Sequence, residues 1–214
     1  MAKTQAFEEH ISEYENWFVD NRMVYLSELE AIRPLLPASS DGIEIGIGSG
    51  LFAEPLGIRE GVEPSRKMRE QAAQRGLRVI KGVAEALPYP SASKTFALMV
   101  TTICFVDDVK KSLEEAYRVL RNNGYLIIAF VDKDSAIGRI YQQHKNESVF
   151  YREATFVGTQ ELTTKLEQAG FTVTDIAQTI FGQLDDIREI QTAIPGSGQG
   201  SFVIIKAQKM TSAD

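Results

Sequence analysis

The sequence predicts an α/β fold: a Rossmann-like, mostly parallel sheet covered by helices on both faces. Short apolar stretches alternate along the chain with segments of helical periodicity. The run at 125–131 is apolar at successive positions, which is typical of a strand buried on both faces. Alternating strands and helices favour parallel connections, and ligands of such sheets bind beyond the carboxyl ends of the strands.

The amino-terminal segment is expected to be helical. Between residues 6 and 36, apolar side chains recur at steps of three and four, and Pro34 and Pro37 end the pattern. Residues 51–58 have room only for a stunted helix, because Pro55 interrupts them. Strands are expected in the apolar stretches that follow, at residues 42–47, 60–63, 77–82 and 95–102.

Three later helices carry capping signals. Residues 65–76 open on Ser65, a favoured N-cap, and stop at a glycine. Asp107 and Asp108 precede a helix at 109–121, and we interpret them as caps rather than metal ligands. The last helix is expected at 159–169 with Thr159 as its cap. A turn is expected at 122–124, and the remaining strands at 125–131, 170–181 and 201–209.

The length of 214 residues suits a single domain over residues 1–214. Within it, residues 1–37 form the helical start, and the polar, aromatic segment 132–158 is a candidate substrate lid. The oligomeric state is left open.

Composition narrows the classes of function. The net charge is −6 without a cluster of basic residues, so we expect no nucleic-acid partner. One cysteine and two histidines give no basis for a metal site. Apolar runs are too short for a membrane span, and the start of the chain lacks the apolar core of a signal peptide, so the cytoplasm is the expected location.

Glycines follow the first expected strand at positions 46, 48 and 50. A dinucleotide-binding loop would place its third glycine at position 51, which is Leu51. The spacing therefore favours a ligand without a diphosphate, although a simple tight turn remains an alternative. Glu63 lies 17 positions after Gly46, near the spacing of about 20 at which a carboxylate binds ribose hydroxyls. A solvated loop acid is the alternative for Glu63.

Several segments in order resemble the class I S-adenosylmethionine-dependent methyltransferases. They are "EIGIGSG", "GVEPS", "GVAEALPYPSASKTFALMV" and "EEAYRVLRNNGYLIIAFV". The resemblance covers roughly residues 10–207 and is greatest for the small-molecule subgroup (methyltransferase type 11) that includes ubiquinone and menaquinone methyltransferases. It implies a seven-stranded sheet, S-adenosylmethionine as cofactor, S-adenosylhomocysteine as product, and a small-molecule methyl acceptor.

The resemblance also implies which residues bind the cofactor. They lie in the glycine loop, at the ends of the second and fourth strands, and in the loop before the fourth strand. These residues are Glu44, Gly46, Gly48, Gly50, Glu63, Pro64, Ser65, Ala84, Glu85, Thr101 and Thr102.

The acceptor side is less defined. Transfer from a sulfonium needs an aligned nucleophile and no catalytic triad, and the sequence shows none. His144, Tyr141 and Tyr14 are candidate catalytic residues, each of which also suits an ordinary loop or core position. The chain has "TTIC" at 101–104 in place of the N/D-P-P-Y/F/W tetrapeptide of many amide methyltransferases. Carbon, nitrogen and oxygen acceptors all stay open.

Two other functions are weighed against this one. A chain with this fold could bind the cofactor without turnover, as a partner subunit. A nicotinamide-dependent oxidoreductase is the other alternative, which the glycine spacing disfavours.

Overall fold

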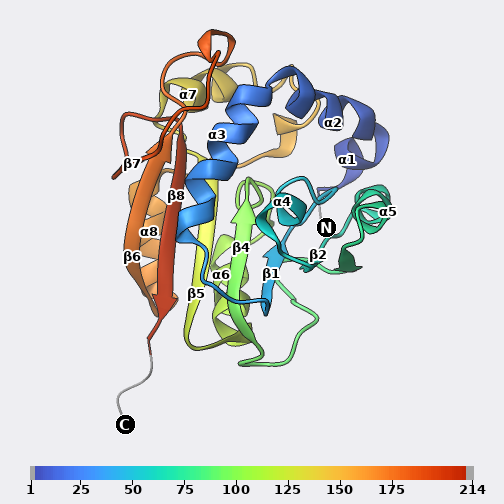
Figure 1. Cartoon of the computed structure of the whole chain (residues 1–214), viewed down its shortest axis with the longest axis vertical. Coiled ribbons are helices and arrows are strands. Elements are labelled where there is room, and N and C mark those ends of the chain that lie inside the picture. The colour runs from blue at the N-terminus through green and yellow to red at the C-terminus, as the bar shows by residue number, and fades with distance from the viewer. Residues whose placement is uncertain (1–2, 211–214) are drawn as a thin grey trace.

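A mixed sheet of eight strands forms the centre of the computed structural model, which describes residues 3–210 (Figure 1). Its order is β3-β2-β1-β4-β5-β8-β6-β7. The strands are β1 Gly42–Ile45, β2 Glu60–Val62, β3 Arg78–Ile80, β4 Lys94–Val100, β5 Leu120–Val131, β6 Phe171–Thr179, β7 Ile194–Pro195 and β8 Phe202–Lys209.

The sheet changes direction at β5. Strands β3, β2, β1, β4 and β5 are parallel, and β8, β6 and β7 then follow in antiparallel pairings. The expected number of seven strands was wrong, because the two-residue β7 pairs with Ala177 and Gln178 of β6 at the edge. A strand this short has no apolar pattern, and its proline is tolerated because it lies at an edge.

Helices cover both faces of the sheet. They are α1 Gln5–Glu9, α2 Ile11–Asp20, α3 Arg22–Ile32, α4 Ala53–Leu56, α5 Arg66–Gln74, α6 Val109–Val119, α7 Ala136–Gln143 and α8 Thr159–Gln168, with 3-10 turns η1 Arg33–Leu35, η2 Tyr151–Glu153 and η3 Leu184–Asp186. Leu113 of α6 and Leu162 of α8 pack on one face. Ile32 of α3 and Ala53 of α4 pack on the other. Figure 1 shows α3 and α4 in front of the sheet and α6 behind it.

Two predicted helix caps are confirmed. Ser65 accepts a hydrogen bond of 3.2 Å from the backbone N–H of Met68, and Asp108 accepts one of 3.0 Å from that of Lys111. The third was wrong, because the side chain of Thr159 does not cap α8. Instead the Asp132 carboxylate, at the end of β5, accepts hydrogen bonds from both the N–H and the hydroxyl of Thr159. A partner 27 positions away along the chain takes the role expected of a local side chain.

The expected turn at 122–124 lies inside β5. Lys94 of β4 pairs with Leu120, but Phe96 pairs with Tyr125, so extra residues of β5 bulge between these pairs. Asn123 in the bulge has a φ of 62°. The left-handed residue that the "NNG" sequence predicts is present, but it bends a strand instead of ending one.

The amino-terminal helices lie beside the carboxyl ends of the parallel strands. The predicted helical segment is divided into α1, α2 and α3, with breaks at His10 and Asn21. In Figure 1, α1, α2 and α7 lie toward the end at which the β4 arrow points. No helix within residues 3–210 is both long and apolar enough to cross a membrane.

Candidate active site

A cavity of about 240 Å³ opens where the parallel strands end. One part of its wall comes from the loops after β1, β2 and β4 and the loop before β4. The residues there that were expected to bind the cofactor are Gly46, Gly48, Glu63, Pro64, Ala84, Glu85, Thr101 and Thr102. The other part comes from α2, α3, α7, and the ends of β5, β6 and β8.

The glycines of the loop after β1 have distinct surroundings. Gly46 has a φ of +70°, and a Cβ there would lie 2.4 Å from the side chain of Thr102. Gly48 has a φ of +55°, and a Cβ there would lie 3.4 Å from the Tyr14 hydroxyl. A Cβ on Gly50 would instead lie 2.3 Å from Leu77 in the core, and Gly50 does not line the cavity. Neighbouring side chains therefore fill the space that a side chain would need at both Gly46 and Gly50, and Gly46 and Gly48, but not Gly50, line the cavity.

Glu63 connects this loop to the end of β2. Its Oε2 accepts a hydrogen bond of 3.0 Å from the Gly48 N–H, and its Oε1 accepts one of 2.8 Å from the Ser65 N–H. The side chain lines the cavity, yet only 7% of the residue is exposed. Burial raises the pKa of Glu63 to about 7 against the opposing effect of the two N–H donors. Each carboxylate oxygen has a further lone pair with which to accept from a ligand hydroxyl.

Glu44 and Ser65 lie behind the cavity wall. Glu44 is 2% exposed, and its Oε2 has no hydrogen-bond partner among residues 3–210. Burial, together with the negative charge of Glu63, holds the pKa of Glu44 well above its usual value. Ser65 is buried as the cap of α5. Neither lines the cavity, so the structure gives both a supporting position.

The end of β4 has a strained backbone. Thr101 has a φ of +49°, which is uncommon for a β-branched residue. The Thr102 hydroxyl lies 3.3 Å from the carbonyl oxygen of Gly46 and 3.1 Å from that of Val100. Beneath this turn, the buried Cys104 thiol donates to the carbonyl of Thr101, and burial raises its pKa to about 12. Strain of this kind, of about 1–3 kcal/mol, is concentrated at ligand sites.

Glu85 faces the cavity from the loop before β4. Its Oε1 accepts hydrogen bonds from the backbone N–H groups of Asp107 and Asp108, at 2.7 and 3.2 Å. Asp108 begins α6, so Glu85 joins two loops at the rim of the cavity.

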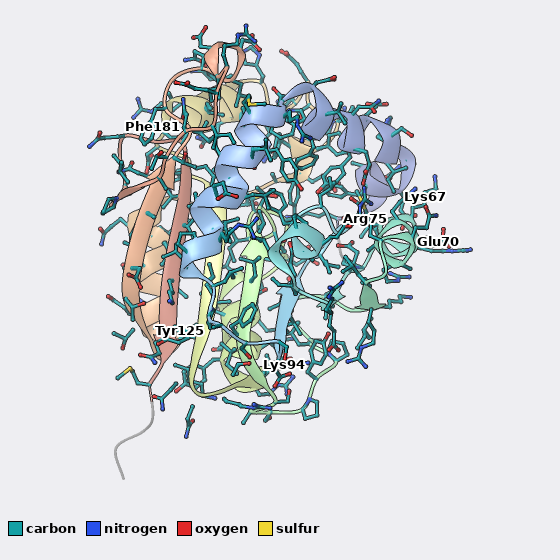
Figure 2. The ribbon with its side chains drawn as sticks, viewed as in Figure 1. Lys67, Glu70, Arg75, Lys94, Tyr125 and Phe181 are labelled. Atoms are coloured by element: carbon teal, nitrogen blue, oxygen red, sulfur yellow. The ribbon has the colours of Figure 1, made fainter. Side chains whose placement is uncertain are left out.

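Arg75 links the glycine loop to the amino-terminal helices. Its guanidinium donates to the carbonyl of Ser49 at 2.9 Å and to the carboxylate of Glu15 in α2 at 2.6 Å. In Figure 2, Lys67 and Glu70 point outward from α5, away from the rest of the molecule, while Arg75 lies on the inner side. The Arg75 side chain thus connects the glycine loop to α2.

Aromatic rings enclose the far part of the cavity. Tyr14 of α2 lies edge-on to Phe150 with 6.0 Å between ring centroids, and Tyr141 of α7 stacks on Tyr151 at 4.7 Å. Trp17 and Phe18 also line the cavity. The amino-terminal aromatic residues therefore meet the segment 132–158, which was expected to be a substrate lid.

Glu28 of α3 is a charged residue that lines the cavity and was not predicted from the sequence. It is 6% exposed and lines the cavity. Burial raises its pKa to about 8. One signal was available, because Glu28 falls on the buried face of α3 that includes Val24 and Ala31.

Of the candidate catalytic residues, the structure brings two to the cavity. Tyr14 and Tyr141 line it, and burial raises the pKa of each phenol. His144 lies just beyond α7 with its side chain 62% exposed, 3.2 Å from Glu147, and does not line the cavity. Within residues 3–210, no group of three His, Cys, Asp or Glu side chains is arranged to hold a metal ion.

Comparison with known proteins agrees with this geometry. Residues 43–128 match the family model described as a methyltransferase domain. A crystal structure from Thermotoga maritima, described as an S-adenosylmethionine-dependent methyltransferase and possible histamine N-methyltransferase, is 48% identical. The match covers 95% of this chain and 98% of that one, with a TM-score of 0.93.

Two curated proteins are also similar. An uncharacterised protein of Methanocaldococcus jannaschii is 38% identical over 95% of this chain and 98% of its own length. A chloroplastic 2-methyl-6-phytyl-1,4-hydroquinone methyltransferase of Oryza sativa is 30% identical over 37% of this chain and 26% of its own. These matches do not single out the ubiquinone-like subgroup.

The fold, the glycines that line the cavity at the strand ends and the similar proteins together define a methyltransferase. The chain belongs to the class I S-adenosylmethionine-dependent methyltransferases, with S-adenosylmethionine as cofactor and S-adenosylhomocysteine as product. The residues present fit this cofactor, because the glycine backbone at positions 46 and 48 and the Glu63 carboxylate line the same cavity, and a carboxylate can accept hydrogen bonds from ribose hydroxyls.

Proposed function

We propose that this enzyme methylates a small organic acceptor held in the aromatic part of the cavity. One observation carries the proposal: the glycine loop, Glu63 and the rings of Tyr14, Tyr141 and Tyr151 line one continuous cavity. A cofactor on the loop and an acceptor among the rings would share that space. The enclosed wall favours a small acceptor over a polymer.

On the cofactor side, each wall residue has a role that its geometry supports. Gly46 and Gly48 line the cavity with backbone atoms, which a ligand could approach closely. Glu63 would accept hydrogen bonds from the ribose hydroxyls. Ala84 and Glu85, at the rim, would border the adenine. The family resemblance implies these roles, and the residues that would perform them line the same cavity.

When bound, S-adenosylmethionine supplies an electrophilic methyl group, so the acceptor lone pair forms the new bond as the carbon–sulfur electron pair returns to sulfur. The protein's part is to align the acceptor and exclude water, which can lower the barrier by several kcal/mol. Tyr14 and Tyr141 keep their protons, because burial raises the pKa of both phenols. They would orient the acceptor by hydrogen bonds and not act as bases.

The similarity to the Thermotoga maritima protein supports nitrogen as the methylated atom, because that protein is described as a possible histamine N-methyltransferase. At 48% identity over nearly the whole of both chains, the two cavities are expected to take related acceptors.

A turnover assay tests the proposal. The purified protein is incubated with S-adenosylmethionine and a panel of small amines, phenols and thiols, and methylated product is identified by mass spectrometry. Phe150→Ala, in the aromatic wall, is expected to lower kcat/KM for the acceptor while leaving S-adenosylhomocysteine affinity unchanged. Phe181→Ala, a partly buried ring that does not line the cavity, is the matched control. Binding of S-adenosylhomocysteine without transfer to any acceptor would contradict the proposal.

A further inference from the structure

We infer that the acceptor is a small molecule with a protonated amino group, that Glu28 binds this ammonium inside the aromatic part of the cavity, and that the methyl group goes to a different atom of the acceptor, which keeps its lone pair. This inference rests on the proposed function, because it names the chemical class of the acceptor. It makes Glu28 a binding residue that determines specificity.

Glu28 is buried without a hydrogen bond or an ion pair to any residue between 3 and 210. Only 6% of the residue is exposed, and its carboxylate makes no hydrogen bond or ion pair with any residue between 3 and 210 that would offset its burial. Buried carboxylates are otherwise paired or hydrogen-bonded, because leaving them alone costs several kcal/mol. The side chain lines the cavity, so a ligand can reach it. A cationic ligand would supply the missing partner.

The groups that face Glu28 are phenols. Its charge adds to burial in raising the pKa of Tyr14 on α2, Tyr141 on α7 and Tyr151 on η2, and it also acts on Tyr25 of its own helix. The Tyr25 hydroxyl already donates to the carbonyl of Leu51. None of these groups carries a positive charge that could neutralise a carboxylate.

Glu28 belongs to the acceptor part of the cavity and not to the cofactor part. The pKa of Tyr14 responds to the charges of Glu44 and Glu63 as well as to Glu28. The pKa of Tyr141 responds to the charge of Glu28 and not to those of the other two acids. The geometry agrees, because Glu28 belongs to α3, which packs against β6 and β8, on the other side of β5 from β1 and its glycine loop.

The remaining wall suits a cation. Tyr14, Trp17, Tyr141 and Tyr151 present aromatic rings, whose faces attract ammonium groups. Lys3 is the basic residue among the described lining residues, whereas the acids are Glu13, Glu28, Glu63, Glu85 and Asp107. An anionic acceptor would meet this negative field, so a protonated amine fits both the charge and the rings.

Binding measured by calorimetry tests the inference. At about pH 8.5 the Glu28 carboxyl, whose pKa burial raises to about 8, is mostly ionised, while a primary amine is still protonated. The protein is saturated with S-adenosylhomocysteine at this pH and titrated with matched pairs of a primary amine and its alcohol. The pairs are phenethylamine with 2-phenylethanol, histamine with 4-(2-hydroxyethyl)imidazole, and butylamine with butanol. In at least one pair, wild-type protein is expected to bind the amine roughly tenfold or more tightly than the alcohol. Equal or weaker binding of the amine in every pair would overturn the inference.

Glu28→Gln keeps the shape of the side chain and removes its charge. The variant is expected to lose roughly tenfold or more in amine affinity, with little change for the alcohol. Glu30→Gln removes a charge from the exposed side of the same helix and should leave both affinities unchanged. Preference for the amine that survives in Glu28→Gln would overturn the inference.

The cofactor titration separates this inference from the proposed function. Glu28→Gln is expected to bind S-adenosylhomocysteine as the wild type does. If it binds that product much more weakly, Glu28 holds the amino group of the cofactor itself, and the inference is overturned while the proposed function stands. Failure of wild-type protein to transfer methyl to any acceptor would defeat the proposed function instead.

Discussion

The carboxylate of Glu63 accepts a hydrogen bond of 3.0 Å from the backbone N–H of Gly48, which fixes the loop after β1 against the end of β2. The same carboxylate accepts from Ser65 at the start of α5. One buried acid thereby sets the relative position of two segments of the cavity wall. The shape of this wall depends on Glu63 before any ligand binds.

Gly46→Ala is expected to lower the free energy of unfolding and to weaken S-adenosylhomocysteine binding. Alanine at a φ of +70° is strained by about 1–2 kcal/mol, and its Cβ would lie 2.4 Å from Thr102. Overpacking of this kind costs about 1–3 kcal/mol more. Urea unfolding and calorimetric titration measure the two effects.

Gly57→Ala is the matched control for that change. Gly57 has a φ of +77°, but a Cβ there would meet nothing within 4 Å. It should show the backbone strain alone, with unchanged ligand binding. Equal losses of stability in the two variants would mean that the contact with Thr102 does not constrain Gly46.

Glu28→Gln is expected to become more stable relative to wild type as the pH rises from 5 to 8. Burial raises the pKa of Glu28 to about 8 from its usual 4.5, so over this range the folded state holds a proton that the unfolded state has lost. Wild-type stability therefore falls with rising pH, and the glutamine variant lacks this loss. The difference should reach roughly 2–4 kcal/mol, measured by urea unfolding at several pH values.

The exposed Glu30→Gln variant of α3 serves as the control here as well. Its unfolding curve should follow that of wild type at each pH. A constant difference between Glu28→Gln and wild type from pH 5 to 8 would show that Glu28 titrates like an exposed acid.

Asp132→Asn is expected to destabilise the protein by about 1–3 kcal/mol. The carboxylate accepts hydrogen bonds from the N–H and the hydroxyl of Thr159, and an amide supplies fewer acceptor sites to the first residue of α8. Thermal or urea unfolding followed by circular dichroism measures the loss.

Asp134→Asn, two positions further along and exposed, tests whether the effect is specific. It should change stability by less than about 0.5 kcal/mol. If the two variants behave alike, the link between Asp132 and α8 does not contribute to stability.

Much of the fold could be predicted because its signals are local. Ser65 and Asp108 cap helices that follow them directly, and Gly57, in the left-handed conformation, ends the single turn of α4 that contains Pro55. What could not be predicted depends on distant partners. Thr159 stands where a cap is expected, but Asp132 performs the role, and the proline-containing β7 is a strand only because β6 lies beside it.

The site, like the fold, has residues that could be predicted from the sequence and residues that only the structure shows. Gly46, Gly48 and Glu63 were found from spacing, and the structure brings them together. The spacing does not distinguish Gly50, because its position against Leu77 is set by packing. Glu28 was missed because its importance comes from what surrounds it: residues of α2, α7 and η2 that only the folded chain assembles.

The central claim is that the wall formed by the glycine loop and Glu63 binds the cofactor. Its most direct test is a calorimetric titration of S-adenosylhomocysteine into wild type, Glu63→Gln and the exposed control Glu70→Gln, with NADH run alongside. Wild type and the control should bind S-adenosylhomocysteine, Glu63→Gln should bind it about tenfold or more weakly, and none of the three should bind NADH. Unchanged affinity in a folded Glu63→Gln variant, or binding of NADH in place of S-adenosylhomocysteine, would contradict it.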